Sequence, residues 1–361
     1  MINRDPMRFQ MALTGTCPDS MTPRNSLLRA ARKLPPVVVV LAVVLALAGC
    51  GGNQNTLDPA SHAESRISNL FWVLFVASSI GFGLVVFLLF LGWWRRNRPD
   101  LPRGVGERGA TGLVIGLGIA LPIVLLSILF VWSDVFVIRS TDAPAKGTTA
   151  MTIVVTGRQW WWQASYQGSA AVTANELHIP VNTRVRIIAR TDDVIHSFWI
   201  PELNRKIDMI PGRSGSILLD ANRPGTYRGQ CSEFCGLQHA HMAVEVIAES
   251  RPAFNRWLAT NARPARAPAG AAAAGLQAFM HSGCADCHQI RGTSAHGLVG
   301  PDLTHLEGRQ TLAAATIANT PTNLADWIRH PQEIKPGSKM PDLQLPAADW
   351  RSILSYLRTL R

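Results

Sequence analysis

The chain has 361 residues, of which 47% are hydrophobic and 16% are charged. Ordinary soluble proteins have roughly 25% charged residues, so this composition indicates membrane-spanning segments and excludes a disordered chain. The net charge of +11 is in the range of nucleic-acid-binding proteins, yet the predicted folded domains, 139–250 and 275–361, carry only +1 each, so we expect no nucleic-acid partner.

The first fifty residues have the pattern of a bacterial targeting segment. Basic side chains precede an apolar run, 37–48, that is too short to span a bilayer. We therefore predict a signal peptide over residues 1–49. The sequence Leu47-Ala48-Gly49-Cys50 is similar to the lipobox of bacterial lipoproteins, which implies a lipid on Cys50; a signal peptide followed by a chance cysteine is the alternative.

Two long apolar runs follow, and each is long enough to cross about 30 Å of hydrocarbon as a helix. We predict the first membrane helix at about 67–94, within an N-terminal segment 50–111, and the second at 112–138. The loop between them carries five arginines and two acidic residues, so the positive-inside rule predicts a cytoplasmic loop. The later domains then lie outside, which indicates a multi-pass protein of the bacterial inner membrane, surrounded by lipid.

Residues 139–262 consist of short β-branched and aromatic runs separated by Pro-Gly turns, a pattern typical of a β-sandwich or barrel. A closing helix is predicted at 252–262, and residues 263–275, rich in Ala and Pro, are predicted to be a linker. The candidate strands lie at 151–156, 159–166, 183–189, 216–220 and 242–248.

The last segment, 276–361, is predicted to be a small all-α domain. Apolar residues at helical spacing predict helices at 277–281, 324–329 and 347–360. A domain of this size with few apolar side chains is marginally stable alone, so we expect a bound cofactor to complete its core.

The densest cluster of metal-binding side chains lies between residues 231 and 242. Cys231, Cys235, His239 and Met242 form a soft-metal ligand set, and His196 could supply a second imidazole. Because a mononuclear blue-copper site uses one cysteine, two cysteines indicate two metals that share bridging thiolates. A structural zinc site, which has no use for the methionine, and a disulfide between the two cysteines are the alternatives.

Cys284-Ala-Asp-Cys287-His288 is the C-x-x-C-H attachment motif for c-type haem. Both cysteines are predicted to form thioethers with the porphyrin, and His288 to bind the iron. Met340 is the only methionine after this motif, so we predict it as the second axial ligand, which is typical of a high-potential electron carrier. The alternative ligands are His296, His305 and His330.

The metal-ligand pattern, with Gly-Arg-Gln-Trp-Trp-Trp at 157–162 and Ile-Pro-Gly-Arg at 210–213, resembles subunit II of the haem-copper cytochrome c oxidases. The resemblance extends from the first membrane helix to about residue 258. It implies a cupredoxin-like domain that holds the binuclear copper centre CuA. By that resemblance, Cys231 and Cys235 bridge both coppers, and His196 and His239 each bind one copper. Met242 is a weak ligand of one copper, and the backbone carbonyl of Glu233 is a ligand of the other.

The resemblance also implies roles for neighbouring residues. The Glu233 side chain reaches a magnesium ion at the boundary with subunit I, and Trp160 receives the electron from cytochrome c, although a core aromatic is the alternative. Ile115 stands where many members carry a glutamate near a proton path, and the nearest carboxylate is Glu107. The segment 204–208, with Lys206 and Asp208, resembles one that faces the haems of subunit I; ordinary surface charges are the alternative.

Together these features predict the subunit through which electrons enter a respiratory cytochrome c oxidase, with a fused cytochrome c domain. Electrons would pass from cytochrome c, or another periplasmic donor, through haem c and CuA to subunit I. We expect no O₂-reducing site in this chain, so O₂ would be reduced to water, with proton translocation, in subunit I. Subunits I and III are the expected partners. A subunit of a CuA-type nitric oxide reductase and a free-standing membrane electron-transfer protein are the alternatives.

Overall fold

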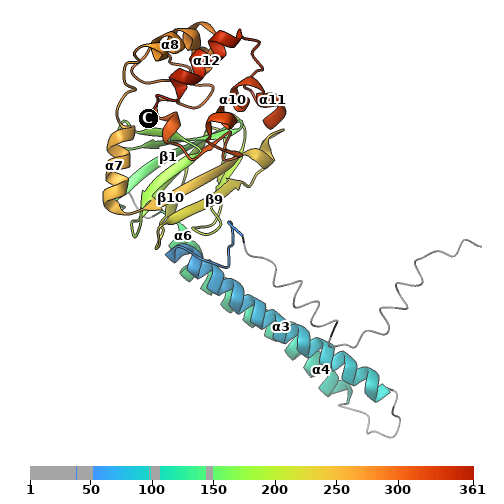
Figure 1. Ribbon diagram of the computed structural model, residues 1–361. Helices are drawn as coiled ribbons and strands as arrows, with labels where there is room; N and C mark the ends of the chain where they lie inside the picture. Colours follow the sequence, from blue (N-terminus) through green and yellow to red (C-terminus); the bar gives the residue numbers. More distant parts are fainter. Residues whose placement is uncertain (1–37, 39–51, 97, 99–105, 144–148) are drawn as a thin grey trace, which may run out of the picture. The chain divides into compact units, whose positions relative to one another are not determined.

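The computed structural model describes residues 38, 52–96, 98, 106–143 and 149–361. The predicted cleavage site and Cys50 lie outside the described residues. Residues 53–361 form one compact unit, which contains two long helical segments, a β-domain and a C-terminal helical domain (Figure 1).

The two long helical segments are apolar and exposed along their length. Helix α3 spans His62–Arg96, and a second segment spans Glu107–Thr141, so both are longer than the predicted 67–94 and 112–138. By length and composition, each is a candidate membrane span. The second segment runs through α4 (Glu107–Ile115), η1 (Gly116–Ala120), α5 (Leu121–Trp132), η2 (Ser133–Ile138) and α6 (Arg139–Thr141).

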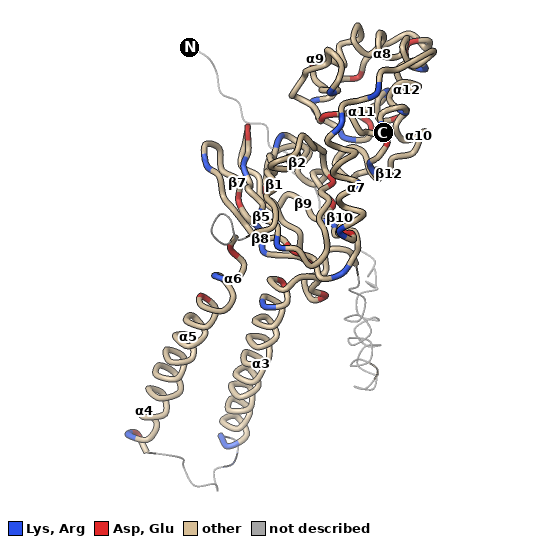
Figure 2. The backbone as a smooth tube through the Cα atoms, turned by 90° about the vertical axis from the view of Figure 1, so that its left-hand side faces the viewer, with Lys and Arg blue, Asp and Glu red and all other residues tan. Residues whose placement is uncertain are grey.

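A π-helical turn interrupts the second span, and the sequence explains its position. Pro122 has no N–H to donate to the preceding turn, and the π-helical η1 lies directly before α5, in which this proline is near the first position. Figure 2 shows charged residues at the ends of α3 and α4 that flank residues 97–105, where Arg95, Arg96 and Arg108 lie.

The β-domain is a sandwich of two five-stranded sheets. The strand orders are β3-β2-β1-β5-β8 and β4-β10-β9-β6-β7, and each sheet contains one parallel pair, β1 with β5 and β10 with β4. Alternate side chains of each strand face the core between the sheets. The strands are β1 (Met151–Arg158), β2 (Trp161–Tyr166), β3 (Val172–Ala174), β4 (Glu176–Pro180), β5 (Val185–Thr191), β6 (His196–Trp199), β7 (Ile207–Met209), β8 (Gly215–Leu219), β9 (Gly225–Cys231) and β10 (Ala243–Glu249).

All five strands expected from the sequence are present, as β1, β2, β5, β8 and β10, while five others were missed. Most of the missed strands are only three to five residues long. The seven-residue β9 was also missed; its first residue, Gly225, had been interpreted as part of a turn at 223–225. Gly229 is required for a steric reason: a Cβ there would lie 2.2 Å from the carbonyl oxygen of Trp199 on the neighbouring strand β6.

The closing helix α7 spans Arg251–Asn261, close to the predicted 252–262. Ser250 caps it by accepting a hydrogen bond from the Ala253 amide, and Pro252 occupies the first turn. The ring of Trp257 stacks on that of His178 with centroids 4.0 Å apart, which holds the helix on the β-domain.

The prediction of a linker over 263–275 was wrong at both ends. Helix α8 spans Ala271–His281 and so begins inside the predicted linker. It starts with a run of alanines, and alanine has the highest helix propensity of all residue types. At the other end, the Ala265 amide donates to the carbonyl of Arg291 at 2.8 Å, so the segment is bound to the C-terminal domain.

The C-terminal domain is helical and is built around the crossing of α8 and α12, which lie side by side in Figure 1. The two helices touch at Gly275, where a Cβ would lie 2.1 Å from the carbonyl oxygen of Ser352. Phe279, Ile353 and Tyr356 fill the core around this crossing. The remaining elements are α9 (Cys284–Cys287), η4 (Leu306–Gly308), β11 (Thr311–Leu312), β12 (Ile317–Ala318), α10 (Pro321–Arg329), α11 (Pro331–Ile334) and α12 (Ala347–Leu357).

Candidate metal centre and haem cavity

The soft-metal residues lie at one end of the β-sandwich, on the loop that joins β9 to β10. We call residues 231–242 the ligand loop; it starts at Cys231, the last residue of β9, and ends immediately before β10. Pairing of β6 with β9 sets Phe198 opposite Cys231, which brings His196, the first residue of β6, close to the loop. The Cys231 amide donates to the carbonyl of Met242 at 3.0 Å and closes the loop.

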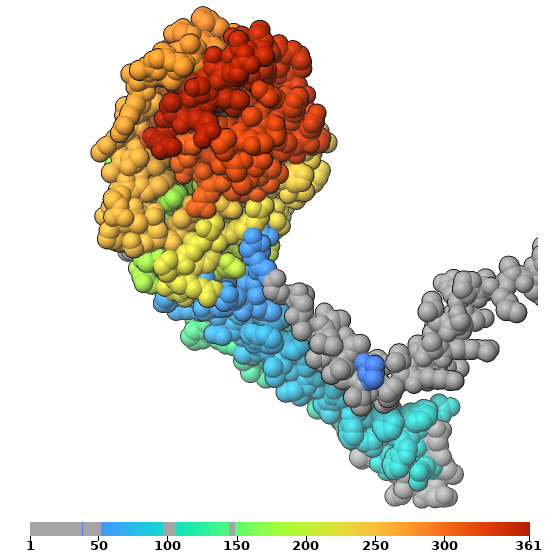
Figure 3. Space-filling model, in the orientation of Figure 1, coloured from blue at the N-terminus to red at the C-terminus, as the bar shows by residue number. Residues whose placement is uncertain are grey.

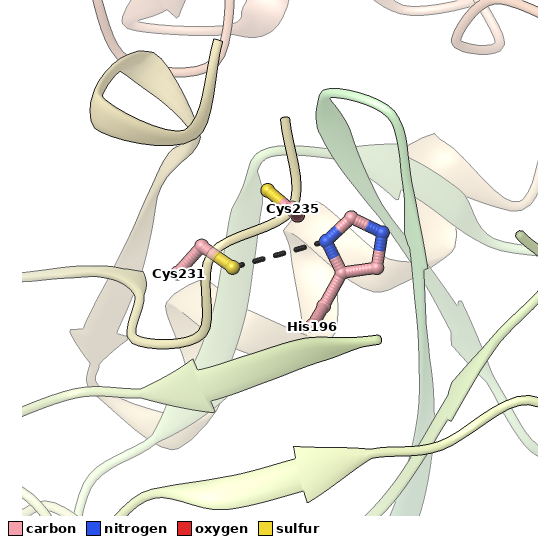
Figure 4. A group of neighbouring side chains, drawn as sticks. All are labelled: His196, Cys231 and Cys235. Carbon is pink, nitrogen blue, oxygen red and sulfur yellow. Dashed lines mark hydrogen bonds between the residues drawn. The ribbon is translucent and has the colours of Figure 1, made fainter. Parts of the chain in front are cut away.

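The donor atoms of this cluster are close enough to share metal ions. Figure 4 shows His196, Cys231 and Cys235 converging, and their ligand atoms lie within 4.8 Å of one another. His196 Nδ1 lies 3.8 Å from Cys231 Sγ, and His239 Nδ1 lies 3.7 Å from Cys235 Sγ. Two atoms bound tetrahedrally to one metal at the usual bond lengths are roughly 3.5 Å apart, so these separations fit a metal between each pair.

Two further donors approach the same thiols. The Met242 sulfur lies 3.8 Å from Cys235 Sγ, and the Glu233 carbonyl oxygen lies 3.2 Å from Cys231 Sγ. Both thiols are free, so the disulfide alternative does not describe this structure. The structure therefore brings together all six residues expected from the sequence. Met242 contributes its thioether sulfur and Glu233 its backbone carbonyl oxygen, and the other four contribute side-chain donors: His196, Cys231, Cys235 and His239.

The electrostatic surroundings favour a thiolate in this cluster. A hydrogen bond with Cys235 lowers the pKa of Cys231 to about 3, against the opposing effect of burial, and His196 contributes a further hydrogen bond. The same interaction raises the pKa of Cys235, because the two sulfurs share one proton. Thiolates are the metal-binding form of cysteine, so a first thiolate is already present at neutral pH.

Asp193 orients the histidine, and it was missed in the sequence. Its Oδ1 lies 2.9 Å from His196 Nε2, which leaves Nδ1 of the ring directed at the thiols. Its Oδ2 accepts a hydrogen bond from the Gln159 amide at 2.7 Å. Carboxylates commonly fix the ring of a metal-binding histidine in this way. The signal was available, as a carboxylate three residues before a candidate ligand.

The three consecutive tryptophans point in different directions, with Trp160 in the turn before β2 and the other two at the start of β2. Trp160 Nε1 donates to the carbonyl of Cys235 at 3.0 Å, and Trp162 Nε1 donates to the carbonyl of Met242 at 3.3 Å. Trp161 Nε1 points the other way and donates to the carbonyl of Val299 in the C-terminal domain at 3.2 Å. Trp160 and Trp162 therefore contact the ligand loop.

The haem-attachment residues line one cavity of the C-terminal domain. Cys284, Cys287, His288 and Met340 all contribute to its wall. His288 Nδ1 lies 2.8 Å from the carbonyl of Pro301, which leaves Nε2 for a metal. Burial lowers the pKa of His288, so the ring is neutral, the form that binds iron.

Gly300 allows the close approach of this histidine to its neighbouring loop, because a Cβ would lie 2.5 Å from Cε1 of the ring. The alternative ligands are elsewhere: His296 and His330 are exposed, and His305 Nε2 is bonded to the carbonyl of Arg263. In the described structure none of the three lines the cavity. The geometry therefore favours Met340 over these histidines.

The cavity is completed by the β-domain, a feature that was not expected from the sequence. Gln159, Trp160, Trp161 and Asn175 form part of its wall, together with the buried Lys335. Burial lowers the pKa of this lysine to about 8. The candidate metal centre and the haem cavity thus share one wall, formed by Trp160.

The remaining predicted residues occupy more exposed positions. Glu233 is exposed on the ligand loop, as is His241, which was considered outside the ligand pattern. Lys206 lies 3.8 Å from Asp208, and both are half-exposed. Ile115 is exposed at the end of α4, whereas Glu107 is in the first turn of that helix.

Comparisons with known proteins agree with these observations. Residues 169–249 match the family profile of the cytochrome c oxidase subunit II periplasmic domain, and residues 272–361 match that of cytochrome c. The chain is 33% identical to cytochrome c oxidase subunit 2 of Alkalihalophilus pseudofirmus, covering 88% of this chain and 95% of the relative. It is 27% identical to the Bacillus subtilis protein of the same name, covering 90% and 97%. Among solved structures, the periplasmic domain of subunit II of cytochrome oxidase from Bradyrhizobium japonicum is 32% identical over 32% of this chain and 96% of that chain, with a TM-score of 0.31.

Proposed function

Because the chain belongs to the cytochrome c oxidase subunit 2 family, we propose that it is the subunit through which electrons enter a respiratory oxidase. It accepts electrons from a c-type cytochrome or another periplasmic donor and delivers them to subunit I, where O₂ is reduced and protons are translocated. One observation carries this proposal: Trp160 lines the haem cavity and also donates a hydrogen bond to the carbonyl of Cys235.

The copper ligands are proposed from the donor set on the ligand loop. Two bridging thiolates, two imidazoles, a thioether and a carbonyl favour copper over zinc, because soft sulfur ligands and a methionine suit copper. A binuclear copper centre supplies one-electron redox chemistry when bound. His196 and Cys231, buried at strand ends, would hold it, with the His196 ring oriented by Asp193. The proposed ligands are His196, Cys231, Glu233 (through its carbonyl), Cys235, His239 and Met242.

The C-terminal domain is proposed to carry one covalent haem c. Thioether bonds to Cys284 and Cys287 would attach it, and His288 and Met340 would be its axial ligands. When bound, the haem supplies a second one-electron carrier. The chain keeps His288 neutral and oriented through Pro301, and Gln332 Nε2 fixes the methionine segment by donating to the Met340 carbonyl at 2.7 Å.

Several finer assignments belong to the same proposal. The exposed Glu233 side chain would bind magnesium at the contact with subunit I, and the bare apolar surfaces of α3 and α5 would contact lipid, subunit I and subunit III. The protein would lie in the bacterial inner membrane with both redox domains in the periplasm. Residues 1–49 would be removed as a signal peptide, and Cys50 would carry a lipid.

The test is purification of the complex from membranes. We expect two coppers and one covalent haem per chain, a copurifying subunit that contains the O₂-reducing site, and O₂ consumption driven by reduced cytochrome c. A chain that purifies alone with both cofactors would support the free-standing electron-transfer protein instead. Nitric oxide reduction without O₂ consumption would support the nitric oxide reductase; neither alternative is favoured by the relatives.

A further inference from the structure

We infer that Lys335 is a positioning residue that fixes the haem domain on the ligand loop. The Lys335 side of the loop is then part of the junction between the two redox domains. This inference rests on the proposed function, since it concerns how electrons reach the same copper site.

Lys335 connects three segments that are far apart in the sequence. Its Nζ donates to the carbonyls of Trp160 at 3.2 Å, His241 at 2.9 Å and Ala313 at 3.2 Å. The first two acceptors belong to the β-domain, and the third belongs to the haem domain. The residue is only 3% exposed, and the three donors of an ammonium group match these three acceptors.

The segment that follows Lys335 continues along the ligand loop. The side chain of Gln238 donates to the carbonyl of Pro336 at 2.6 Å. A Cβ on Gly337 would lie 2.8 Å from Cδ1 of Leu237, so the Leu237 side chain packs closely against the Gly337 backbone. Lys339 lies 3.9 Å from Asp193, the carboxylate that orients His196. Residues 335–339 therefore contact the ligand loop and lead directly to Met340.

The rest of the interface is formed by polar contacts from other elements. Glu176 accepts hydrogen bonds from the amides of Gln310 at 3.0 Å and Thr311 at 2.7 Å, and Arg228 donates to the carbonyl of Ala315 at 2.9 Å. The outer surface of the haem domain, in orange and red, adjoins that of the β-domain in Figure 3. These contacts hold the domains together, and among the hydrogen bonds between them in the described residues, the bond from Lys335 is the one that ends on Trp160.

Trp160 is consequently held on both sides. Its indole donates to the Cys235 carbonyl, and its own carbonyl accepts from Lys335. Both Trp160 and Lys335 line the haem cavity, and Trp161 beside them is only 7% exposed. The position of Trp160 between the haem cavity and the ligand loop therefore depends on Lys335.

The experiment uses the complete oxidase complex and the variant Lys335→Met, which keeps a long buried side chain but has no donor. Haem c is reduced by a light-activated ruthenium reductant, and electron transfer to copper is followed optically. We expect the rate constant for electron transfer to fall at least about tenfold. Without the ammonium group, three buried carbonyls lose their charged partner, which shifts the equilibrium between docked and undocked haem domain by about tenfold. Arg351→Met, which removes a positive charge from an exposed position of helix α12 in the same domain, outside the cavity lining, should slow transfer less than about threefold.

The haem and copper absorption bands must be intact in both variants for the comparison to be made. An unchanged rate in Lys335→Met with both bands intact would overturn the inference. Absence of either band in the unmodified complex would instead contradict the proposed function.

A second measurement needs no variant. Acetylation of the unmodified complex by an amine-reactive ester, read by mass spectrometry, should leave Lys335 unmodified when Lys339 has reacted. Equal modification of the two lysines would show that the junction opens freely and would contradict the inference.

Discussion

The indole nitrogen of Trp160 donates a hydrogen bond to the carbonyl oxygen of Cys235 across 3.0 Å. This bond links a residue of the haem-cavity wall to a proposed copper ligand 75 residues further along the chain. Gln159 Nε2 donates to the same oxygen at 2.9 Å, so the carbonyl is held from two sides. The electron path proposed above therefore continues from the wall of the haem cavity to the copper site through a fixed contact.

Replacing Trp160 with phenylalanine removes the donor and keeps an aromatic ring. We expect haem-to-copper electron transfer to slow by about fivefold to tenfold, because losing one hydrogen bond weakens this contact by about 1 kcal/mol. The copper band should not change, since Trp160 is not a ligand. Flash reduction of haem c measures the rate, and Trp257→Phe, on helix α7, is the control; an equal loss in both variants would exclude a specific path through Trp160.

Replacing Cys231 with serine tests the copper assignment. The variant should lose nearly all copper and its near-infrared absorption, because a bridging thiolate contributes to both metals. Its covalent haem should remain, since the attachment residues lie in another domain. Elemental analysis provides the copper content, and His241→Ala, an exposed histidine of the same loop, should keep normal copper. Retention of the band in Cys231→Ser would refute the assignment.

Replacing Met340 with leucine tests the axial ligation of the haem. The haem should stay attached through its two thioethers but lose the methionine ligand, so its reduction potential and its sulfur-to-iron absorption band should both fall. Met280→Leu, on helix α8 outside the cavity lining, is the matched control. A normal potential and band in Met340→Leu would identify a different ligand.

Replacing Gly275 with alanine tests the helix crossing of the haem domain. The added Cβ meets the Ser352 carbonyl at 2.1 Å and Tyr356 Cβ at 2.7 Å, so one helix must shift. We expect a loss of about 1–3 kcal/mol of stability, the usual range for overpacking. Thermal unfolding followed at the haem absorption measures it. Gly308→Ala, which has no heavy atom within 4 Å of the new Cβ, should unfold near the normal temperature.

The buried amine of Lys335 predicts a pH dependence. Its pKa is lowered from 10.5 to about 8 by burial, against an opposing effect of the Cys235 thiol. Between these two values the unfolded chain binds more protons than the folded chain, so this residue's contribution to stability rises with pH across that window. The difference in unfolding free energy between the unmodified protein and Lys335→Met should grow by on the order of 1–3 kcal/mol from pH 7 to pH 10. A constant difference would show that the amine is solvated.

Much of the fold and of the candidate site was predictable from local patterns. The two membrane helices follow from uninterrupted apolar runs, and the β-domain follows from strands and turns that recur along the chain. The linker was misjudged because composition alone does not show whether a short segment is bound elsewhere. The strand β9 was missed because a glycine inside a strand is not expected from local pattern. The need for glycine at position 229 comes from the neighbouring strand, where the carbonyl of Trp199 leaves no room for a Cβ.

By itself, the sequence determined which chemistry the chain can carry. Ligands within the ligand loop and within Cys284–His288 are a few residues apart, so residue type and spacing specify them before any folding is known. The tertiary structure decided what surrounds them: Asp193 behind His196, Trp160 in the wall of the haem cavity, and Lys335 bonded to a carbonyl 175 residues away. Such contacts depend on how the two domains pack, because hydrogen bonds between distant segments form only where packing places a donor and an acceptor together.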